Sequence, residues 1–419
     1  MGAAMTRAAG IPSLRVLICG GGIAGEAAAY WLARGGHRVT VVERFPALRA
    51  TGAQVDLRGQ GIDAVRRMGL LDVVGSKLVD EAGVALVNAR GKARATIMAN
   101  TSGRGRQTLT SEYEIMRGDL VRVLHDATKE DVEHVFGVSV DRFEQDEKRV
   151  VAHFSNGTSG EFDLLVGADG QGSRLRRAIL PPGTADPYRR VGIHMAYWFI
   201  PRIATDTNIR DTYHAPGRMI MRRSHNPAET QVYFILREES EEASAVHREP
   251  IERRKKFWSD RFRDAGWQTE RFLEGMRTAD DFYSQEVVQV CTDTWSKGRV
   301  VLVGDAAHCA SPFSGMGVSG GLVGAYVLAG EINRHPHDLP RALADYDTTL
   351  RPFVDEIQAT VKPRLLRLAM PGSRWAIDAF HSAAAVACFL RLPELVARHA
   401  KEDRGGDWRL PEYPDLDNG

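Results

Sequence analysis

The sequence predicts an α/β protein in which a parallel sheet is interrupted by a mostly antiparallel sheet and followed by helices. Three observations support this fold class. An apolar run, a glycine turn, a helix-forming stretch and a β-branched run follow one another within residues 14–42. Residues 188–286 contain alternating segments rich in aromatic side chains. Beyond Leu339 helix formers dominate, and a chain of 419 residues suits more than one domain.

The first strand–helix–strand unit is the clearest element. Leu14 to Cys19 is a short apolar run typical of a buried parallel strand. Ile23 to Arg34 has the composition and spacing of a helix, which Gly35 and Gly36 end. Arg38 to Val42 is β-branched and predicts the next strand.

Two later segments repeat the pattern of a strand followed by glycine. One is Phe162 to Gly170, and the other is Arg299 to Asp305, which precedes a helical stretch from Val318 to Asn333. We expect both strands to join the first parallel sheet. The region between them, with alternating segments such as 194–199 and 231–236, predicts an inserted antiparallel sheet. Helices are expected from Leu339 to about Met370 and, beyond Pro371-Gly372, to about Ala400.

Charge and cysteine usage exclude several classes of protein. The net charge is +1 without a long basic run, so nothing indicates nucleic-acid binding. The four cysteines are far apart, which argues against a metal site or disulfide framework and favours a reducing, cytoplasmic location. The first ten residues lack the apolar core of a signal peptide. No segment approaches the roughly 20 apolar residues that span a bilayer, and Ala383 to Leu390 predicts a buried helix instead.

The strongest motif is Gly-x-Gly-x-x-Gly, formed by Gly20, Gly22 and Gly25 between the first strand and its helix. The first glycine permits a tight turn, the second lets the backbone approach a pyrophosphate, and the third lets the helix pack against the sheet. The helix N-terminus offers free N–H groups to phosphates. Glu43, followed by Arg44, ends the second strand, where a carboxylate can bind a ribose hydroxyl. This context predicts a dinucleotide site and disfavours a glycine turn that binds nothing.

Further segments specify the dinucleotide. Ala168-Asp169-Gly170 resembles the Asp-Gly segment of flavoprotein hydroxylases. Gly304 to His308, with Pro312, Gly315 and Gly317, resembles their second flavin-binding segment, and Arg117 matches the arginine beside the cofactor. Between about Leu14 and Met370 the chain therefore resembles the class A flavoprotein aromatic hydroxylases, typified by para-hydroxybenzoate hydroxylase. The run Gln54 to Arg58 and the arrangement around Arg117 look most like the tetracycline-inactivating flavin monooxygenases.

The resemblance implies a Rossmann-like FAD-binding domain and a monooxygenase that uses NAD(P)H and O2. A flavin C4a-hydroperoxide would transfer one oxygen atom to a small aromatic, phenolic or polyketide-like substrate. Because the flavin carries this chemistry, no side chain is assigned a certain catalytic role. In this family NADPH or NADH binds transiently, and no second Gly-x-Gly-x-x-Gly follows a predicted strand. The chain departs from many relatives in having Met316, Ser319 and Gly324 where they carry Gln, Asn and an acidic residue.

The expected division is a flexible tail (1–13), an FAD-binding domain (14–187 and 287–338), a substrate domain (188–286) and a C-terminal helical region with a tail (339–419). We expect the inserted sheet to supply the substrate wall. Its candidate side chains are His194, Tyr197, Arg218, Met221 and Tyr233. By the resemblance Arg218 would pair with an acidic or enolic substrate group, but a solvated strand arginine is an equal alternative. For the tyrosines core packing is the alternative, and His308 and Cys309 are expected to be structural.

Two other functions remain open on the sequence. A flavin-dependent halogenase carries Trp-x-Trp-x-Ile-Pro, of which this chain has Trp198, Ile200 and Pro201 but Ala196 in place of the first tryptophan. A reductase on the same fold is a further flavoprotein alternative. A non-catalytic binding module would need no flavin, and the retained Arg117 and Asp305 argue against it. Partners other than a small molecule and O2 are not indicated, and the oligomeric state is not specified.

Overall fold

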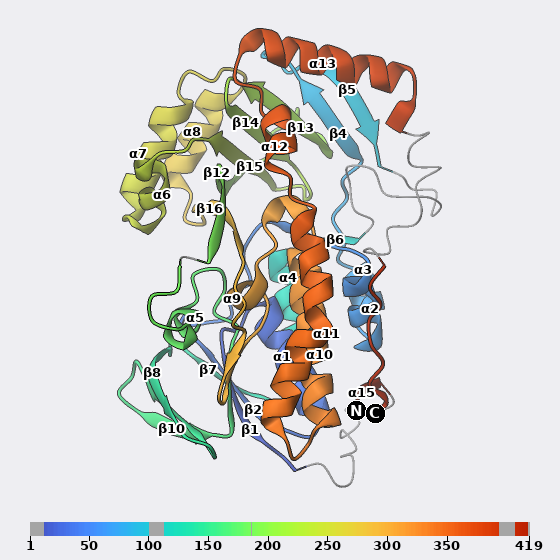
Figure 1. Cartoon of the computed structure of the whole chain (residues 1–419). Helices are drawn as coiled ribbons and strands as arrows, with labels where there is room; N and C mark the ends of the chain where they lie inside the picture. The colour runs from blue at the N-terminus through green and yellow to red at the C-terminus, as the bar shows by residue number, and fades with distance from the viewer. Residues whose placement is uncertain (1–11, 100–112, 186, 394–406, 418–419) are drawn as a thin grey trace.

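The computed structural model describes residues 12–99, 113–185, 187–393 and 407–417. Figure 1 shows two sheets joined by long central helices, with a further helical layer on the upper sheet. The expected tail up to residue 11 and the expected helix beyond residue 393 lie outside the described residues. None of the helices in the described part of the chain is long and apolar enough to cross a bilayer.

The lower sheet has six strands in the order β17-β18-β11-β1-β2-β7, all parallel except β17. The predicted strands are among them, as β1 (Arg15–Cys19), β2 (Arg38–Glu43), β11 (Leu164–Gly167) and β18 (Val300–Leu302). The other two are β7 (Glu133–Phe136) and β17 (Ser296–Lys297). The central residues of β1, β11 and β18 are fully buried, as expected for apolar strands of a covered parallel sheet. This confirms the predicted parallel sheet.

The helix α1 (Ile23–Arg34) packs on this sheet and against α10 (Gly317–Arg334), which in turn packs against α11 (Leu339–Ala359). The three helices run side by side through the centre of the molecule (Figure 1). Small residues on α1 and α10, including Ala24 and Gly321, allow this close approach, since a Cβ at Gly321 would lie 3.2 Å from the Ala24 Cβ. The N-termini of both helices thereby meet at the carboxyl edge of the lower sheet.

The upper sheet has seven strands in the order β16-β12-β15-β14-β13-β4-β5. The inserted segment supplies β12 (Tyr188–Pro201), β13 (Ile209–Ala215), β14 (Arg218–Arg223), β15 (Glu229–Arg237) and the start of β16 (Tyr283–Val290). These strands are antiparallel, as predicted. The sheet also takes in β4 (Gly83–Val87) and β5 (Ala93–Met98), because β4 pairs with β13 in parallel. This departs from the expected division, in which residues 83–98 belong to the FAD-binding part.

Helices α6 (Glu241–Ala245), α7 (Ile251–Phe262) and α8 (Thr269–Thr278) flank the upper sheet, with the short turn η1 (Val246–Arg248) between α6 and α7. Their aromatic side chains form a core with one face of β12, β14 and β15. The remaining strands make two small sheets: β8 (Val140–Gln145), β9 (Val150–Phe154) and β10 (Ser159–Phe162) form one, and β3 (Gln54–Leu57) with β6 (Tyr113–Met116) forms the other. Helices α2 (Gln60–Arg67), α3 (Leu71–Gly75), α4 (Arg117–Asp126) and α5 (Arg174–Ile179) complete this part.

The C-terminal region is helical but interrupted. Beyond α11 come α12 (Pro363–Ala369) and α13 (Arg374–Phe389), so the expected break near Pro371 is present and a second break lies at residues 360–362. Helix α13 crosses the upper sheet beside β5 (Figure 1). The last described segment ends in α15 (Pro414–Asp417) and docks on α10, where Tyr413 and Leu416 are buried in the main core. The C-terminal residues 407–417 are therefore part of the packed fold.

Candidate functional site

The glycine turn after β1 has a geometry that only glycine permits. Gly20 has φ +112°, in the region that disfavours other residues. A Cβ at Gly25 would lie 1.9 Å from the carbonyl oxygen of Gly20, so helix α1 and the turn are in direct backbone contact. The backbone N–H of Gly20 donates to the carbonyl of Val42, which fixes the turn between β1 and β2. The first and third glycines of the motif therefore have the roles assigned from the sequence.

The segments singled out in the sequence converge on this turn. A Cβ at Gly20 would lie 2.5 Å from the Ala168 carbonyl oxygen, which places the Ala168-Asp169 segment against the turn. A Cβ at Gly304 would lie 2.6 Å from the Ala24 Cβ, so the Gly304-Asp305 turn meets the first turn of α1. The carboxyl ends of β1, β11 and β18 thus meet where ligands bind in open α/β sheets.

Two helix N-termini at this place have no side-chain cap. The residue before α1 is Gly22 and the residue before α10 is Met316, and neither side chain accepts a hydrogen bond from the first turn. A Cβ at Gly317 would have no neighbour within 4 Å, so the start of α10 faces open space. Free N–H groups and the positive end of the helix dipole favour negatively charged ligand atoms at both positions.

Glu43 lies at the end of β2 beside the glycine turn. Its Oε2 accepts from the backbone N–H of Gly21 at 2.9 Å, and its Oε1 accepts from that of Phe45 at 3.0 Å. Both bonds hold the carboxylate in place, and each oxygen keeps a lone pair for a ribose hydroxyl. The neighbouring Arg44 is exposed, and its guanidinium lies 5.1 Å from the centre of the Phe45 ring.

Arg117 lies at the start of α4 and joins the turn to the loop after β2. Its Nη1 donates to the backbone carbonyls of Arg49 and Thr51, both at 3.0 Å. Its Nη2 is 3.5 Å from the position of a Cβ at Gly22. Burial and the positive charge of Arg49 lower the pKa of Arg117. Arg49, whose guanidinium lies 5.6 Å from the centre of the Tyr283 ring, has no separate signal in the sequence.

The two predicted aspartates differ in their surroundings. Asp169 accepts from the backbone N–H of Arg174 at 2.7 Å through Oδ2, which caps α5, while its buried Oδ1 has no partner. Asp305 begins the short helix α9 (Asp305–His308). Solvent reaches its carboxylate, yet protein atoms crowd it closely enough that desolvation raises its pKa. Both carboxylates thus keep an oxygen available to a polar ligand.

The loop between α9 and α10 contains Pro312, Gly315 and Gly317. Ser311 has φ +77° and Gly315 has φ +65°, so the backbone is held in a tight conformation around the short turn η2 (Pro312–Ser314). A Cβ at Gly315 would lie 3.3 Å from Arg58 Nε and 3.4 Å from Asp56 Oδ2. The run Gln54 to Arg58 therefore faces this loop.

Ser319, one of the departures from the family pattern, joins the same two segments. Its hydroxyl accepts from the backbone N–H of Arg58 and donates to the Arg58 carbonyl, both at 3.0 Å. Gly324, another departure, lies beside His308, since a Cβ there would be 3.2 Å from His308 Nε2. That nitrogen is buried without a partner. The third departure, Met316, is buried and packs in the main core at the start of α10.

This arrangement fits a dinucleotide with a long extended linker. The glycine turn and the start of α1 suit a pyrophosphate, Glu43 suits the ribose at one end, and the open space at the start of α10 suits a planar group at the other. Asp169 lies beside the glycine turn, and its Oδ1 has no hydrogen-bond partner within the protein. The residues present therefore fit FAD.

Comparison with known proteins agrees with this geometry. The model of the FAD binding domain family matches residues 13–358. An FAD-dependent monooxygenase of Sarocladium schorii is 38% identical and the alignment covers 97% of this chain and 99% of that protein. The crystal structure of tetracycline destructase Tet(51) has a TM-score of 0.79 at 30% identity, over 96% of this chain and 100% of that one.

The chain belongs to the FAD-dependent monooxygenases. A flavin-dependent monooxygenase of Phoma sp is also similar, with 36% identity over 96% of this chain and 98% of that protein. A structure of Klebsiella pneumoniae HpxO complexed with FAD and uric acid shares the fold, with a TM-score of 0.70 at 20% identity over 92% of this chain and 96% of that one. These findings confirm the predicted class A flavin monooxygenase family and its fold.

The five substrate candidates of this monooxygenase lie on opposite faces of the upper sheet. Tyr233 is directly opposite both Tyr197 on β12 and Met221 on β14, so these three share one face. Leu236 is directly opposite both His194 and Arg218, so these share the other face, on which Leu236 packs into the core with α7 and α8.

Arg218 and His194 therefore do not fit the substrate role expected for them. The Arg218 guanidinium donates to Asp264 Oδ1 and to the carbonyl of Arg261, both at 2.6 Å, beside the end of α7. Trp198 is on the same helix-covered face, where its Nε1 donates to the carbonyl of Phe272. Trp198 and Ile200 of the partial halogenase-like segment are thus core residues.

The face with Tyr197, Met221 and Tyr233 is turned toward the loop between α9 and α10. On this face an apolar cluster joins strand residues to Phe313 of the loop and to α12 with the residue after it: Ile193, Met195, Met219, Met221, Ile235, Phe313, Leu366 and Met370. Burial raises the pKa of Tyr197 to about 12 and also raises that of Tyr233, so both hydroxyls keep their protons at neutral pH.

Polar groups at the edge of this face were not recognised individually in the sequence. Gln54 is buried and neither its Oε1 nor its Nε2 has a partner. Gln231 Oε1 accepts from the Tyr233 hydroxyl at 3.0 Å, but its Nε2 has no partner. Nearby, the buried Arg223 pairs with Glu81 at 2.7 Å and with Glu114. The amides are the groups of this region that are free to bind a substrate oxygen.

His308 and Cys309 are buried, as expected for structural residues. Burial lowers the pKa of His308 to about 4 and raises that of the Cys309 thiol well above its ordinary value. A neutral imidazole and a protonated thiol are the forms that such surroundings favour. Neither group has the ionisation that acid–base or thiolate chemistry would require at neutral pH.

His194 and His247 form a hydrogen-bonded chain in which both rings can be neutral, the forms that their burial favours. His194 Nε2 donates to the Glu238 carbonyl at 3.0 Å, so its Nδ1 accepts from His247 Nε2 at 3.0 Å. His247 Nδ1 then accepts from the Ser284 hydroxyl at 3.1 Å. Burial, followed by the charges of His194 and Arg254, lowers the pKa of His247 to about 3, and burial also lowers that of His194.

Acid is therefore expected to destabilise this monooxygenase before its carboxylates titrate. A histidine whose pKa is lower in the folded than in the unfolded state stabilises the fold above its ordinary pKa of about 6.5 and loses that contribution as the pH falls. We expect the free energy of unfolding to drop by roughly 1–3 kcal/mol per buried histidine between pH 6.5 and 4. His247→Gln, whose amide keeps both hydrogen bonds, should reduce this drop in urea unfolding at pH 7 and pH 5. An equal drop in both proteins would contradict the assignment.

Proposed function

We propose that this monooxygenase uses NADPH or NADH and O2 to hydroxylate a flat aromatic, phenolic or polyketide-like compound. The observation that carries the proposal is the methionine- and tyrosine-rich face of β12, β14 and β15, which is turned toward the loop of Phe313 and Gly315. Flexible thioethers and aromatic rings pack well against planar ring systems of varied outline.

The cofactor would lie across the carboxyl edge of the lower sheet. The Gly20–Gly25 turn and the N-terminus of α1 would hold the pyrophosphate, and Glu43 the adenosine ribose. Asp169, Asp305 and Arg117 would hold the linker region, and the loop of Pro312, Gly315 and Gly317 the ring system, with Arg44 at the outer end. FAD supplies the electron transfer and the activation of O2 when bound.

The residues of the chain would then bind and orient the substrate and exclude water. The apolar cluster around Met221 and Phe313 removes water from the space beside the loop. The unpartnered amides of Gln54 and Gln231 would bind substrate oxygens, because a buried amide without a partner is costly unless a ligand satisfies it. The Tyr197 and Tyr233 rings, 5.7 Å apart, would form the flat wall.

The similar proteins support this class of substrate. The similar proteins of Sarocladium schorii and Phoma sp are monooxygenases that use a flavin. The solved structure at 30% identity is a tetracycline destructase, and tetracycline is a fused-ring compound with phenolic and enolic oxygens. A planar, oxygen-rich ring system suits both the apolar face and the free amides described above.

The proposal is tested by adding phenols, polyketides and tetracyclines to the yellow holoenzyme with NADPH or NADH. We expect one compound to increase nicotinamide oxidation and to yield a product heavier by one oxygen atom. A yellow protein with no stimulated oxidation by any of these compounds contradicts the hydroxylase proposal. Incorporation of chloride into the product would replace it by the halogenase.

The assignment of the sheet faces is tested by two substitutions on the same strand. Met221→Ala removes apolar contact with the substrate, and at about 0.8 kcal/mol per buried methylene we expect KM to rise by roughly tenfold or more. Arg218→Ala is the matched control on the opposite face. It should leave KM unchanged, because the contacts that it removes, with Asp264 and with the Arg261 carbonyl, lie on the helix-covered face. The reverse result, with KM raised by Arg218→Ala alone, would restore the expectation drawn from the sequence.

A further inference from the structure

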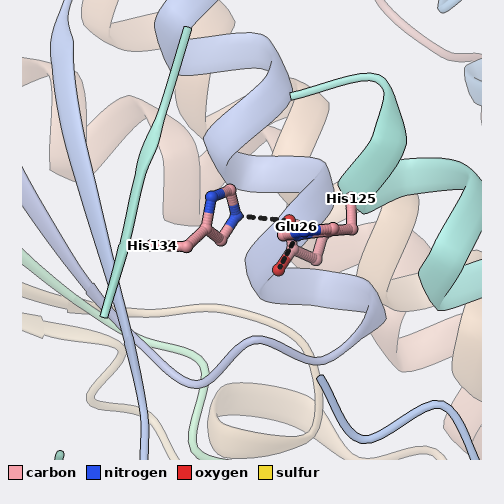
Figure 2. A group of neighbouring side chains, drawn as sticks. All are labelled: Glu26, His125 and His134. Carbon is pink, nitrogen blue, oxygen red and sulfur yellow. Dashed lines mark hydrogen bonds and ion pairs between the residues drawn. The ribbon is translucent and has the colours of Figure 1, made fainter. Parts of the chain in front are cut away.

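A cluster of two histidines and a glutamate lies behind the glycine turn, and none of its side chains is assigned to the proposed flavin or substrate sites. Glu26 is in the first turn of α1, His125 is near the end of α4, and His134 is on β7. Figure 2 shows the three side chains pointing toward one another from these elements. One ligand atom of each residue lies within 4.8 Å of the others. The proposed flavin chemistry does not use this cluster.

The hydrogen bonds of His134 set the protonation of its ring. Its Nδ1 lies 3.2 Å from the Val132 carbonyl, an acceptor, so Nδ1 carries a proton. In the neutral ring Nε2 then has a lone pair, and it lies 3.0 Å from Glu26 Oε2. Two acceptors at this distance repel each other unless a second proton or a metal cation is present. Histidine ligands of metals commonly donate their other N–H to a backbone carbonyl in this way.

The second oxygen of Glu26 gives an independent indication of a ligand. Glu26 is 0% exposed, and its Oε1 has no hydrogen-bond partner. His125 Nδ1 lies 3.8 Å from this oxygen and is itself buried without a hydrogen-bond partner. A zinc ion about 2.0–2.2 Å from each atom would separate tetrahedral ligand atoms by about 3.3 Å. The distance from His134 Nε2 to Glu26 Oε2 is 3.0 Å and that from His125 Nδ1 to Glu26 Oε1 is 3.8 Å, so each histidine lies near this distance from one of the two carboxylate oxygens.

The cluster also has the charge and access that a cation needs. Among the described residues, Glu26 forms ion pairs with the two histidines and with no lysine or arginine. The Thr128 hydroxyl lies 3.2 Å from Glu26 Oε2 and helps to orient the carboxylate. The His125 side chain is 19% exposed, so the cluster lies close to solvent. A zinc site with three protein ligands takes a water as its fourth ligand.

A second cluster of two carboxylates and a histidine differs from the first, because arginine side chains pair with its carboxylates. Glu331, His335 and Asp345 also lie together, but Arg334 donates to Glu331 at 2.8 Å and Arg341 donates to Asp345 at 2.8 Å. The Tyr413 hydroxyl adds a bond of 2.6 Å to Glu331. Guanidinium groups there already supply the positive charge that a metal would provide.

We propose that Glu26, His125 and His134 form a binding site for a divalent transition-metal ion, with zinc as the best fit to two imidazoles and one carboxylate. The ion joins α1, α4 and β7 and is separate from the flavin chemistry. Cysteine spacing in the sequence gives no sign of it, because its ligands come from three distant elements and include no cysteine.

The test measures zinc bound to the full-length holoenzyme after treatment with a chelator and dialysis against Zn²⁺. We expect one zinc per chain in the wild type and its loss in His134→Gln and Glu26→Gln. His335→Gln, which removes a histidine from the contrasting cluster, should still bind one zinc. Zinc should also raise the thermal midpoint of the wild type but not of the first two variants.

Histidine NMR of the wild type keeps the proposal testable if a variant does not fold. Zinc should shift the signal of His134 Nε2 and leave Nδ1 protonated. No zinc bound to the wild type, or equal binding in Glu26→Gln and the wild type, overturns the proposal. A His134 ring that carries two protons at neutral pH and does not respond to zinc would show instead a buried ion pair with Glu26.

Discussion

Gly25→Ala is expected to yield a protein that does not retain FAD and is less stable than the wild type. The new Cβ would lie 1.9 Å from the Gly20 carbonyl oxygen, and because both atoms belong to the backbone, no rotamer change relieves the contact. Helix α1 would have to move away from the turn that receives the phosphates. Overpacking of this severity costs about 3 kcal/mol. Absorbance of the flavin bands per chain and urea unfolding measure the two effects.

Gly75→Ala is the matched control. Gly75 ends α3, where a Cβ would have no neighbour within 4 Å. Alanine in an open helical position is neutral or stabilises by up to about 1 kcal/mol. This variant should therefore be yellow with an unchanged or higher unfolding midpoint. A Gly25→Ala protein with full FAD content and the midpoint of the wild type would contradict the role assigned to the turn.

Tyr413→Ala is expected to destabilise the whole cofactor domain, although Tyr413 is near the end of the chain. The Tyr413 ring is 4% exposed and lies directly over Gly330 of α10, and its hydroxyl donates to the buried Glu331 at 2.6 Å. Alanine would leave a cavity beside α10 and remove this bond. We expect a loss of about 3–5 kcal/mol in the free energy of unfolding, measured with urea.

Tyr413→Phe separates the two contributions. It keeps the ring and removes only the hydroxyl, while Glu331 retains its contact with Arg334. We expect a loss of about 1–2 kcal/mol from the missing hydrogen bond. If alanine and phenylalanine gave the same midpoint, the docking of the C-terminal segment would contribute little, and the large expected effect would be wrong.

The parts of the fold that the sequence predicted well depend on local signals. The strand before Gly20, helix α1 and the strand ending at Glu43 each have a short-range pattern, and the structure places them within one residue or so of the expected bounds. The glycine turns of residues 168–170 and 304–305 were recognisable for the same reason. Their convergence on one turn follows from parallel strands whose carboxyl ends share an edge.

The parts that were missed depend on contacts between distant residues. The pairing of β4 with β13 has no local signal, so residues 83–98 were not expected in the upper sheet. Alternation along β12 and β14 shows which residues share a face, but not which face α7 and α8 cover. The sequence therefore did not show that His194 and Arg218 lie on the helix-covered face, whereas Tyr197, Met221 and Tyr233 lie on the other. Likewise, the polar composition of residues 407–417 does not predict that Tyr413 packs against α10.

The strand order of the lower sheet also constrains how the protein is made. The central strand β1 pairs with β11, which starts at Leu164, and β11 pairs with β18, which starts at Val300. A ribosome must therefore synthesise more than two thirds of the chain before this sheet can be completed, and the segment that covers α10 emerges last. Long-range parallel pairing is slow and leaves strand edges exposed in the meantime. We therefore expect the nascent chain to expose unpaired strand edges for longer than a protein of the same size with local topology.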